Sequence, residues 1–175
     1  MRIGFRHCDP RFPFLWQSPM QPAARWHGAN EGPANYFADT PVGAWAEFLR
    51  HEGISDEADL AGVQRSLWAV ELPEAGYASP VLPDNTLFGD ESSHPTCQTE
   101  ARRLRAAGAD RLEVRGAALN PGQARGWTAT AGVSASQVLR DGKVLVLFGA
   151  CHCIGWVAVD GGRPPADVLP LVRHL

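Results

Sequence analysis

The chain has 175 residues, 45% of them hydrophobic and 20% charged, and reads as one domain over residues 1–175 that can bury a substantial core. A formal charge of −3, without a long basic block, argues against direct nucleic-acid binding through phosphate contacts. No run of about eighteen apolar residues occurs, which argues against a membrane span.

Eighteen glycines and fourteen prolines favour a loop-rich α+β fold over a helical bundle. The N-terminal segment lacks the apolar stretch of a secretory signal, so we expect a cytoplasmic protein. Reduced thiols are then expected at the four cysteines: Cys8, Cys97, Cys151 and Cys153. The Cys151-His152-Cys153 triplet lacks the spacing and the second ligand pair of a zinc site, so no metal is expected.

The N-terminal third predicts two short strands separated by a long loop. Apolar residues alternate with polar or small ones over Arg2–Arg6, which is typical of a strand. Residues His7–Asn35 contain five prolines that break any regular run and are expected to form a loop. A second short strand is expected over Tyr36–Ala38.

A helix is predicted to begin at Thr40-Pro41 and to run to about Glu52. The threonine hydroxyl can cap free N–H groups, and proline is tolerated at the first helical position. Glu47 points about 200° away from Trp45 at 100° per residue. This position suits either a solvated glutamate or a polar face that lines a cleft. Three apolar residues share the opposite face: Trp45, Phe48 and Leu49.

The rest of the chain predicts several short elements around a long loop. Residues Ser66–Leu72 are expected to form a strand, and residues Glu74–Ser93 a loop that is either a lid or an idle surface segment. A second helix is expected from Pro95 or Thr96 to Gly108. Further strands are expected over Arg111–Arg115, Trp127–Thr130, Val144–Phe148 and Gly155–Val159, followed by a short helix over Pro165–Val172.

The segment from Gln21 to Glu52 holds residue types that suit a dinucleotide. Arg25, next to Trp26 and His27, offers a planar guanidinium for phosphate. Tyr36 offers an aromatic face for a base, and Glu47 offers a carboxylate for a developing cation. Arg6 in the first strand offers a second guanidinium, although it could equally be an ordinary ion-pair partner.

The order of the segments GFR, ARWHG, ANYFADT and GAWAEFLRHE resembles the RES-domain family, which is named for an arginine, a glutamate and a serine. The likeness continues into CQTEARRLRAAGADRLEVRGAAL and KVLVLFG. It implies a single compact α+β domain with a mixed or antiparallel sheet and a few helices, similar to the RES or ADP-ribosyltransferase-like fold. Family members include toxins of toxin–antitoxin pairs that consume NAD by phosphorolysis or hydrolysis, or that transfer ADP-ribose.

The resemblance also implies site roles. Three residues are expected to be catalytic: Glu47, Arg25 and Tyr36. Four are expected to bind substrate: Arg6, Trp26, His27 and Gly116. NAD is the expected substrate, no metal is expected, and a small helix-turn-helix antitoxin is the expected partner of a toxin.

The chain departs from the family pattern at one position. Where the family carries its serine, in a segment of the type V-x-Ser-Ala, this chain has Val114-Arg115-Gly116-Ala117. Ser134 or Ser136 could supply a hydroxyl instead. This departure raises the alternative of a RES-like domain that binds a nucleotide without turning it over. A structural or protein-interaction domain with the same fold is a third possibility.

Overall fold

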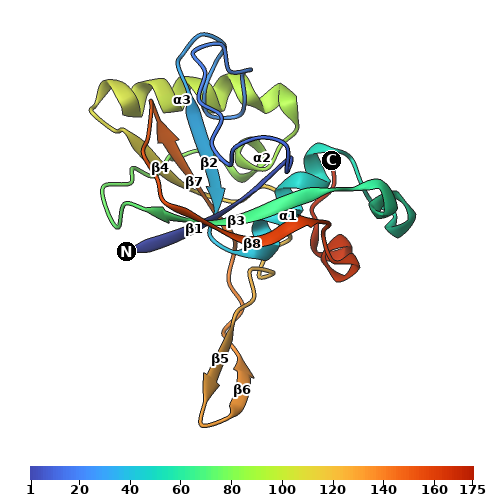
Figure 1. The fold of residues 1–175 in the computed structure, drawn as a ribbon. Coiled ribbons are helices and arrows are strands. Elements are labelled where there is room, and N and C mark those ends of the chain that lie inside the picture. Colours follow the sequence, from blue (N-terminus) through green and yellow to red (C-terminus); the bar gives the residue numbers. More distant parts are fainter.

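The computed structural model describes residues 1–175 and contains one six-stranded sheet, in the order β4-β7-β2-β1-β3-β8, with every neighbouring pair antiparallel (Figure 1). The α+β class and the antiparallel sheet are as predicted. The sheet strands are β1 (Arg2–Cys8), β2 (Ala34–Ala38), β3 (Arg65–Leu72), β4 (Arg111–Arg115), β7 (Lys143–Phe148) and β8 (Gly155–Gly162). The α-helices are α1 (Pro41–His51), α2 (Asp84–Leu87) and α3 (His94–Ala106). None of the helices is long and apolar enough to cross a membrane.

The sheet consists of two halves that run in different directions. Strands β1 and β3 pair along seven positions, whereas β1 and β2 pair only between Phe5 and Ala38. In Figure 1 the half formed by β4, β7 and β2 crosses the half formed by β1, β3 and β8 at a steep angle. The strands β1 and β2 therefore diverge beyond this single pair and leave an opening between the two halves.

Three apolar clusters hold this arrangement. Helix α1 packs on β1 and β2 through a cluster that contains Trp45 and Leu49. Helix α3 covers the β4-β7-β2 half through the buried side chains of Cys97 and Ala101. The third cluster joins the halves by packing Phe37 of β2 against residues of β3 and β7. Burying one large side chain of this kind contributes roughly 1.5–3 kcal/mol, so these clusters dominate the stability of the fold.

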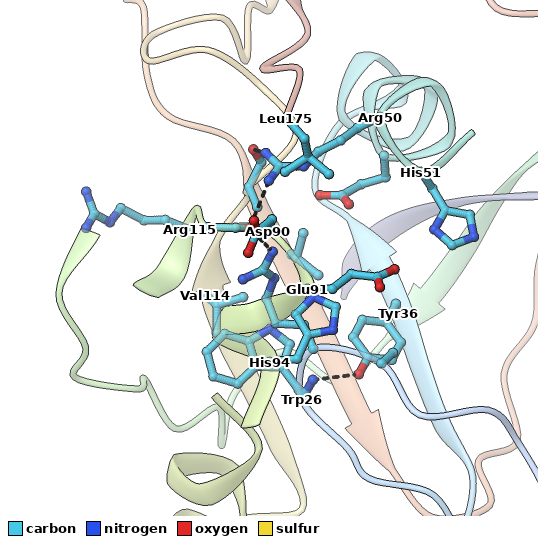
Figure 2. A pocket seen from close by; sticks show the side chains of 16 residues that line it. Trp26, Tyr36, Arg50, His51, Asp90, Glu91, His94, Val114, Arg115 and Leu175 are labelled. Carbon is cyan, nitrogen blue, oxygen red and sulfur yellow. Dashed lines mark hydrogen bonds between the residues drawn. The ribbon is translucent and has the colours of Figure 1, made fainter. Parts of the chain in front are cut away.

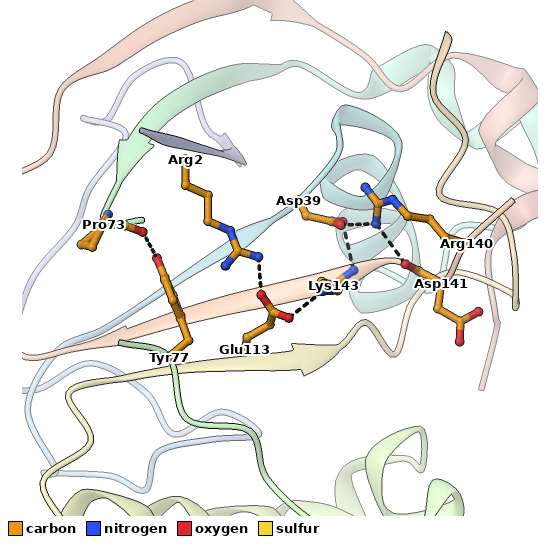
Figure 3. Close-up of polar contacts among 8 residues, drawn as sticks. All are labelled: Arg2, Asp39, Pro73, Tyr77, Glu113, Arg140, Asp141 and Lys143. Atoms are coloured by element: carbon orange, nitrogen blue, oxygen red, sulfur yellow. Dashed lines mark hydrogen bonds and ion pairs between the residues drawn. The ribbon is translucent and has the colours of Figure 1, made fainter. Parts of the chain in front are cut away.

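Polar contacts also tie the halves together. Arg2 of β1 pairs with Glu113 of β4, which accepts a second bond from Lys143 Nζ of β7 at 2.6 Å (Figure 3). Asp39, just after β2, accepts from the Lys143 backbone N–H at 2.9 Å and pairs with Arg140. Because these groups are partly exposed, each pair adds at most about 1 kcal/mol.

The N-terminal end of α1 has the cap that its sequence predicts. The Gly43 backbone N–H donates to Thr40 Oγ1 at 3.0 Å, and Pro41 occupies the first turn. Losing such a cap typically costs about 1 kcal/mol. The helix ends at His51, and Gly53 follows with φ of +67°, a conformation that favours glycine. The predicted helix is therefore confirmed to within one residue at its C-terminal end.

Other elements differ from the expectations. The expected loop of residues Glu74–Ser93 contains α2 and the 3₁₀ helix η2 (Glu91–Ser93). A further 3₁₀ helix, η1 (Glu57–Gly62), precedes β3. The expected C-terminal helix is instead the 3₁₀ helix η3 (Ala166–Leu171), which contains Pro170 and so lacks one backbone donor.

The second sheet is a hairpin of β5 (Trp127–Thr130) and β6 (Val133–Ser136). The strand β6 was not predicted. All eight strand residues are exposed, and the hairpin projects away from the body of the molecule in Figure 1.

Candidate functional site

A cleft lies between α1, the segment of α2 and η2, and the diverging strands. It consists of two adjoining cavities of about 220 and 250 Å³, which share Tyr36, Glu47, His51 and Val144. Figure 2 shows side chains from the sheet, from α1 and from the η2–α3 junction pointing into the first cavity. The cleft is therefore built where the sheet opens.

Glu47 lines both cavities. Helix α1 places it there because Trp45, Phe48 and Leu49 face the core on the other side of the helix. Burial raises the pKa of the Glu47 carboxyl, while the nearby Arg50 and Arg25 guanidinium groups oppose this shift. Of the two possibilities that the sequence left open, the cleft-lining position is the one observed.

Arg25 also lines the first cavity, but its guanidinium is largely engaged by the protein. Its Nη1 donates to the Thr86 carbonyl at 3.2 Å and to Ser93 Oγ at 2.9 Å. Its Nη2 donates to the Gly89 carbonyl at 2.7 Å. Arg25 thus fixes the segment of residues 86–93 against the cleft, so this part of the long loop is bonded to the cleft wall.

Arg50 is a site residue that the sequence reasoning did not select. It lies one turn after Glu47 on α1 and is only 8% exposed. Its Nη2 donates to the carbonyls of Phe88 and Gly89 at 2.9 and 3.0 Å, and its Nη1 donates to the carbonyls of Ala117 and Arg173. The signal in the sequence was the i, i+3 spacing from Glu47, which puts both residues on the same helix face.

Tyr36 presents its ring to the cleft and turns its hydroxyl away from it. The hydroxyl accepts the Trp26 backbone N–H at 3.1 Å and lies 2.9 Å from His27 Nδ1. Burial raises the pKa of the Tyr36 hydroxyl above its usual range. The hydroxyl is therefore neutral and committed to the loop, and the ring is the part of Tyr36 that a ligand can contact.

Trp26 and His27 stand behind this tyrosine. Both are almost fully buried, at 2% and 1% exposure. Trp26 lines the first cavity and packs in the cluster beneath α3, whereas His27 lines neither cavity. The geometry places His27 as a partner of Tyr36 and not in the cleft itself.

Arg6 lines the second cavity together with Glu47. Its Nη1 lies 3.4 Å from Asn35 Oδ1, and its guanidinium lies over the Phe37 ring, 5.9 Å from the centroid. It forms no ion pair with a carboxylate, so the possibility of an ordinary ion-pair partner is not the one observed. A partly buried cation without a carboxylate partner suits an anionic ligand.

Gly116 is not brought together with the other expected site residues. It borders a different surface hollow, and its N–H donates to the Gly142 carbonyl at 2.7 Å. A Cβ at this position would lie 3.4 Å from the Gly142 carbonyl carbon and oxygen, an ordinary contact. The next residue, Ala117, does line the first cavity.

The two serines considered as substitutes for the family serine lie elsewhere. Ser134 and Ser136 are exposed residues of β6, on the projecting hairpin, and neither lines the cleft. The suggestion that either supplies the missing hydroxyl to this cleft is therefore wrong in this structure.

The chain matches the RES domain over residues 2–138. It belongs to the RES domain family. The match spans β1 through β6 and so includes Arg6, Arg25, Tyr36, Glu47 and Gly116. A comparison with curated proteins found no match to this chain.

The RES domain contains no cluster of three or more His, Cys, Asp or Glu side chains arranged to hold a metal ion. All four cysteines are free thiols. The expectation of metal-free chemistry stays a prediction.

Proposed function

We propose that this RES domain is an NAD-consuming enzyme that cleaves the nicotinamide–ribose bond. The observation that carries the proposal is that the Glu47 carboxylate and the unpaired guanidinium of Arg6 line one cavity. A carboxylate and a cation in one cleft match the two charges of the substrate, a cationic sugar centre in the transition state and an anionic pyrophosphate.

We assign Glu47 to the end of the substrate where the nicotinamide–ribose bond breaks. Nicotinamide is a good leaving group because its ring nitrogen is cationic, and the ribose becomes oxocarbenium-like as the bond breaks. An ionised carboxylate beside that sugar stabilises the positive charge and can hold a ribose hydroxyl. Water, phosphate or a protein side chain then accepts the ADP-ribosyl group, which gives hydrolysis, phosphorolysis or ADP-ribosyl transfer.

Arg6 and Tyr36 are assigned to binding. Arg6 holds phosphate oxygens, and the exposed side of the Tyr36 ring packs against the nicotinamide. Arg25 supports the cleft wall through its bonds to residues 86–93 and adds positive charge beside it. We assign Trp26 to substrate contact because it lines the first cavity. We assign His27 an indirect role through the Tyr36 hydroxyl.

The family resemblance extends this proposal to a cellular setting. The protein is proposed to act in the cytoplasm as a toxin, with a small helix-turn-helix antitoxin as its partner. An antitoxin that covers the cleft mouth would keep NAD out.

A second candidate is a RES domain that binds a nucleotide without turnover, and the absence of a serine at Gly116 favours it. The position has room for a Cβ atom, which would make only ordinary contacts there. Turnover that appears only in a Gly116→Ser variant would support this second function.

The test is the release of nicotinamide from NAD by the purified chain, measured with and without inorganic phosphate, beside thermal stabilisation by NAD and by ADP-ribose. The proposal predicts release, and the sugar product identifies the acceptor as water or phosphate. Stabilisation by both nucleotides without release from NAD, and without modified protein, would favour the second function. If the chain neither releases nicotinamide nor is stabilised by either nucleotide, both candidate functions are contradicted and the interaction domain is favoured.

A further inference from the structure

A second hollow, of about 530 Å³, lies at the ends of β3 and β7 and shares no lining residue with the two cavities of the cleft. It is lined by Cys151, His152 and Cys153. Both thiols are free and partly exposed. The family role described above uses none of these residues.

The two cysteines are held in a defined loop. Gln17 brackets Cys151, since its Nε2 donates to the Cys151 carbonyl at 2.8 Å and its Oε1 accepts the Cys151 N–H at 2.7 Å. The Cys151 and Cys153 side chains line the same hollow. Only one residue separates them in sequence, so a disulfide between them would close a small ring within one loop.

The Cys151 thiol is also linked to the cleft. Its Sγ accepts from Asn35 Nδ2 at 3.2 Å, and Asn35 Oδ1 lies 3.4 Å from Arg6 Nη1. Asn35 is fully buried, so it has few alternative partners. A change at Cys151 therefore reaches Arg6 through a single side chain.

We propose that Cys151 and Cys153 form a dithiol site that low-molecular-weight disulfides oxidise to an intramolecular disulfide, and that this oxidation loosens Arg6 in the cleft. The link to Arg6 rests on the proposed function, whereas the oxidation itself does not.

The chemistry has two exchange steps. Burial, followed by the neighbouring Cys153, raises the pKa of the Cys151 thiol to about 12, so little Cys151 thiolate is present at neutral pH. The Cys153 thiolate attacks one sulfur of the small disulfide, and one thiolate leaves with the electron pair. Cys151 then loses its proton to solvent and attacks the Cys153 sulfur, which expels the second thiolate. Two protein thiols are oxidised, and one small disulfide is reduced to two thiols.

Ring closure draws Cys151 Sγ toward Cys153 and weakens its contact with Asn35. The Asn35 amide then loses a fixed position, and the bond from Arg6 to Asn35 Oδ1 loosens. The loss of about one charge-assisted bond between Arg6 and the substrate raises KM for NAD roughly tenfold.

The experiment treats the full chain with oxidised glutathione and measures the intact mass, the free thiols, and KM for NAD before and after reduction. The proposal predicts a mass lower by two hydrogen atoms, the loss of two free thiols, and a rise in KM that a thiol reductant reverses. A stable glutathione adduct without ring closure, or no reaction at all, would overturn the dithiol site. Ring closure with an unchanged KM would overturn the link to Arg6.

Cys153→Ser is the matched variant, since it keeps the contact between Asn35 and Cys151 but cannot close the ring. It should retain the reduced protein's KM after the same treatment, and a rise in KM in this variant would contradict the proposal. If the reduced protein releases no nicotinamide, thermal stabilisation by ADP-ribose replaces KM. The intact mass then still shows whether the ring closes. A failure of the proposed function can therefore be told apart from a failure of the dithiol site.

Discussion

Glu47 and Arg50 lie one turn apart on the same face of α1, yet they form no ion pair. Arg50 directs its guanidinium to four backbone carbonyls from three segments of the chain. No ion pair therefore occupies the Glu47 carboxylate in the cleft, although the guanidinium groups of Arg50 and Arg25 lie near it. This arrangement keeps the carboxylate available to a ligand.

Replacing Glu47 by Gln should stabilise the fold at neutral pH. The folded-state pKa of Glu47 is raised, mainly by burial, so its favourable contribution is fully present below the ordinary pKa of glutamate and is lost as pH rises through the folded pKa. The ionised side chain thus lowers the free energy of unfolding at neutral pH, and glutamine removes that effect. Thermal unfolding should give a higher Tm for Glu47→Gln at neutral pH, with the difference shrinking in acid. A lower Tm at neutral pH would contradict the assignment of burial as the cause.

Replacing Arg50 by Met should destabilise the protein by roughly 3 kcal/mol, because buried carbonyls lose their donor. This corresponds to about 6–12 °C in Tm for a chain of this size. Denaturant unfolding measures the loss. The exposed Arg103, which pairs only with Glu100 on α3, provides the matched control, and Arg103→Met should change stability little.

The same Arg50 variant should also alter the pH profile of NAD cleavage. The Arg50 cation lowers the pKa of Glu47, so its removal raises that pKa further. The acid limb of the kcat profile should then move to higher pH. The more conservative Arg50→Lys variant should keep the limb close to its original position. An unmoved acid limb in Arg50→Met would mean that Arg50 has only a structural role.

Two substitutions of Tyr36 separate the contribution of its ring from that of its hydroxyl. Tyr36→Phe keeps the ring in the cleft but leaves the Trp26 N–H without its acceptor, at a cost of about 1–2 kcal/mol in stability. Tyr36→Ala also removes the stacking surface and should raise KM for NAD roughly tenfold, since base stacking is worth about 1–3 kcal/mol. Steady-state kinetics of the two variants measure the difference. A larger rise in KM for Phe than for Ala would show that the hydroxyl binds the substrate.

His7 should contribute to acid unfolding. Burial, with added repulsion from Arg65 and Arg6, lowers the pKa of its imidazole to about 3. Its contribution to stability is fully present above the ordinary histidine pKa of about 6.5 and is lost as pH falls toward the folded value. The slope is at most about 1.4 kcal/mol per pH unit. Unfolding measured across this window should be less pH-dependent in His7→Gln than in the parent chain.

The hairpin of β5 and β6 should be dispensable for cleft chemistry. The Gln137 N–H donates to the Gly126 carbonyl at 2.8 Å, so the two ends of the hairpin already meet. Deleting residues 127–136 should leave NAD cleavage and Tm nearly unchanged, because the hairpin strands are exposed. A marked loss of cleavage would return a role to Ser134 or Ser136.

The sequence predicted elements whose signals are local. The Thr40 cap and the apolar face of α1 are encoded within about three turns, and the β3 strand ends at Leu72 as expected. The strand β6 carried no strong β signal, since it reads Val-Ser-Ala-Ser, and its turn uses Ala131 with φ of +50°. Short 3₁₀ segments such as η2 likewise depend on capping by neighbouring residues more than on periodicity.

The candidate site was predictable only where residue type and resemblance agreed. Glu47, Tyr36 and Arg25 were identified and do line the cleft. The engagement of Arg25 with the carbonyls of Thr86 and Gly89 could not be seen, because those contacts span more than sixty positions in the chain. Long-range partners of this kind are set by how the two halves of the sheet meet, which no local pattern reports.

The most direct test of the account is nicotinamide release from NAD by the parent chain and by Glu47→Gln, with Glu52→Gln as the control. Glu52 follows the same helix but is exposed and lines neither cavity. The parent chain and Glu52→Gln should release nicotinamide, while Glu47→Gln should release none and remain folded. Equal release by Glu47→Gln would contradict the assignment of this carboxylate to the chemistry of the cleft.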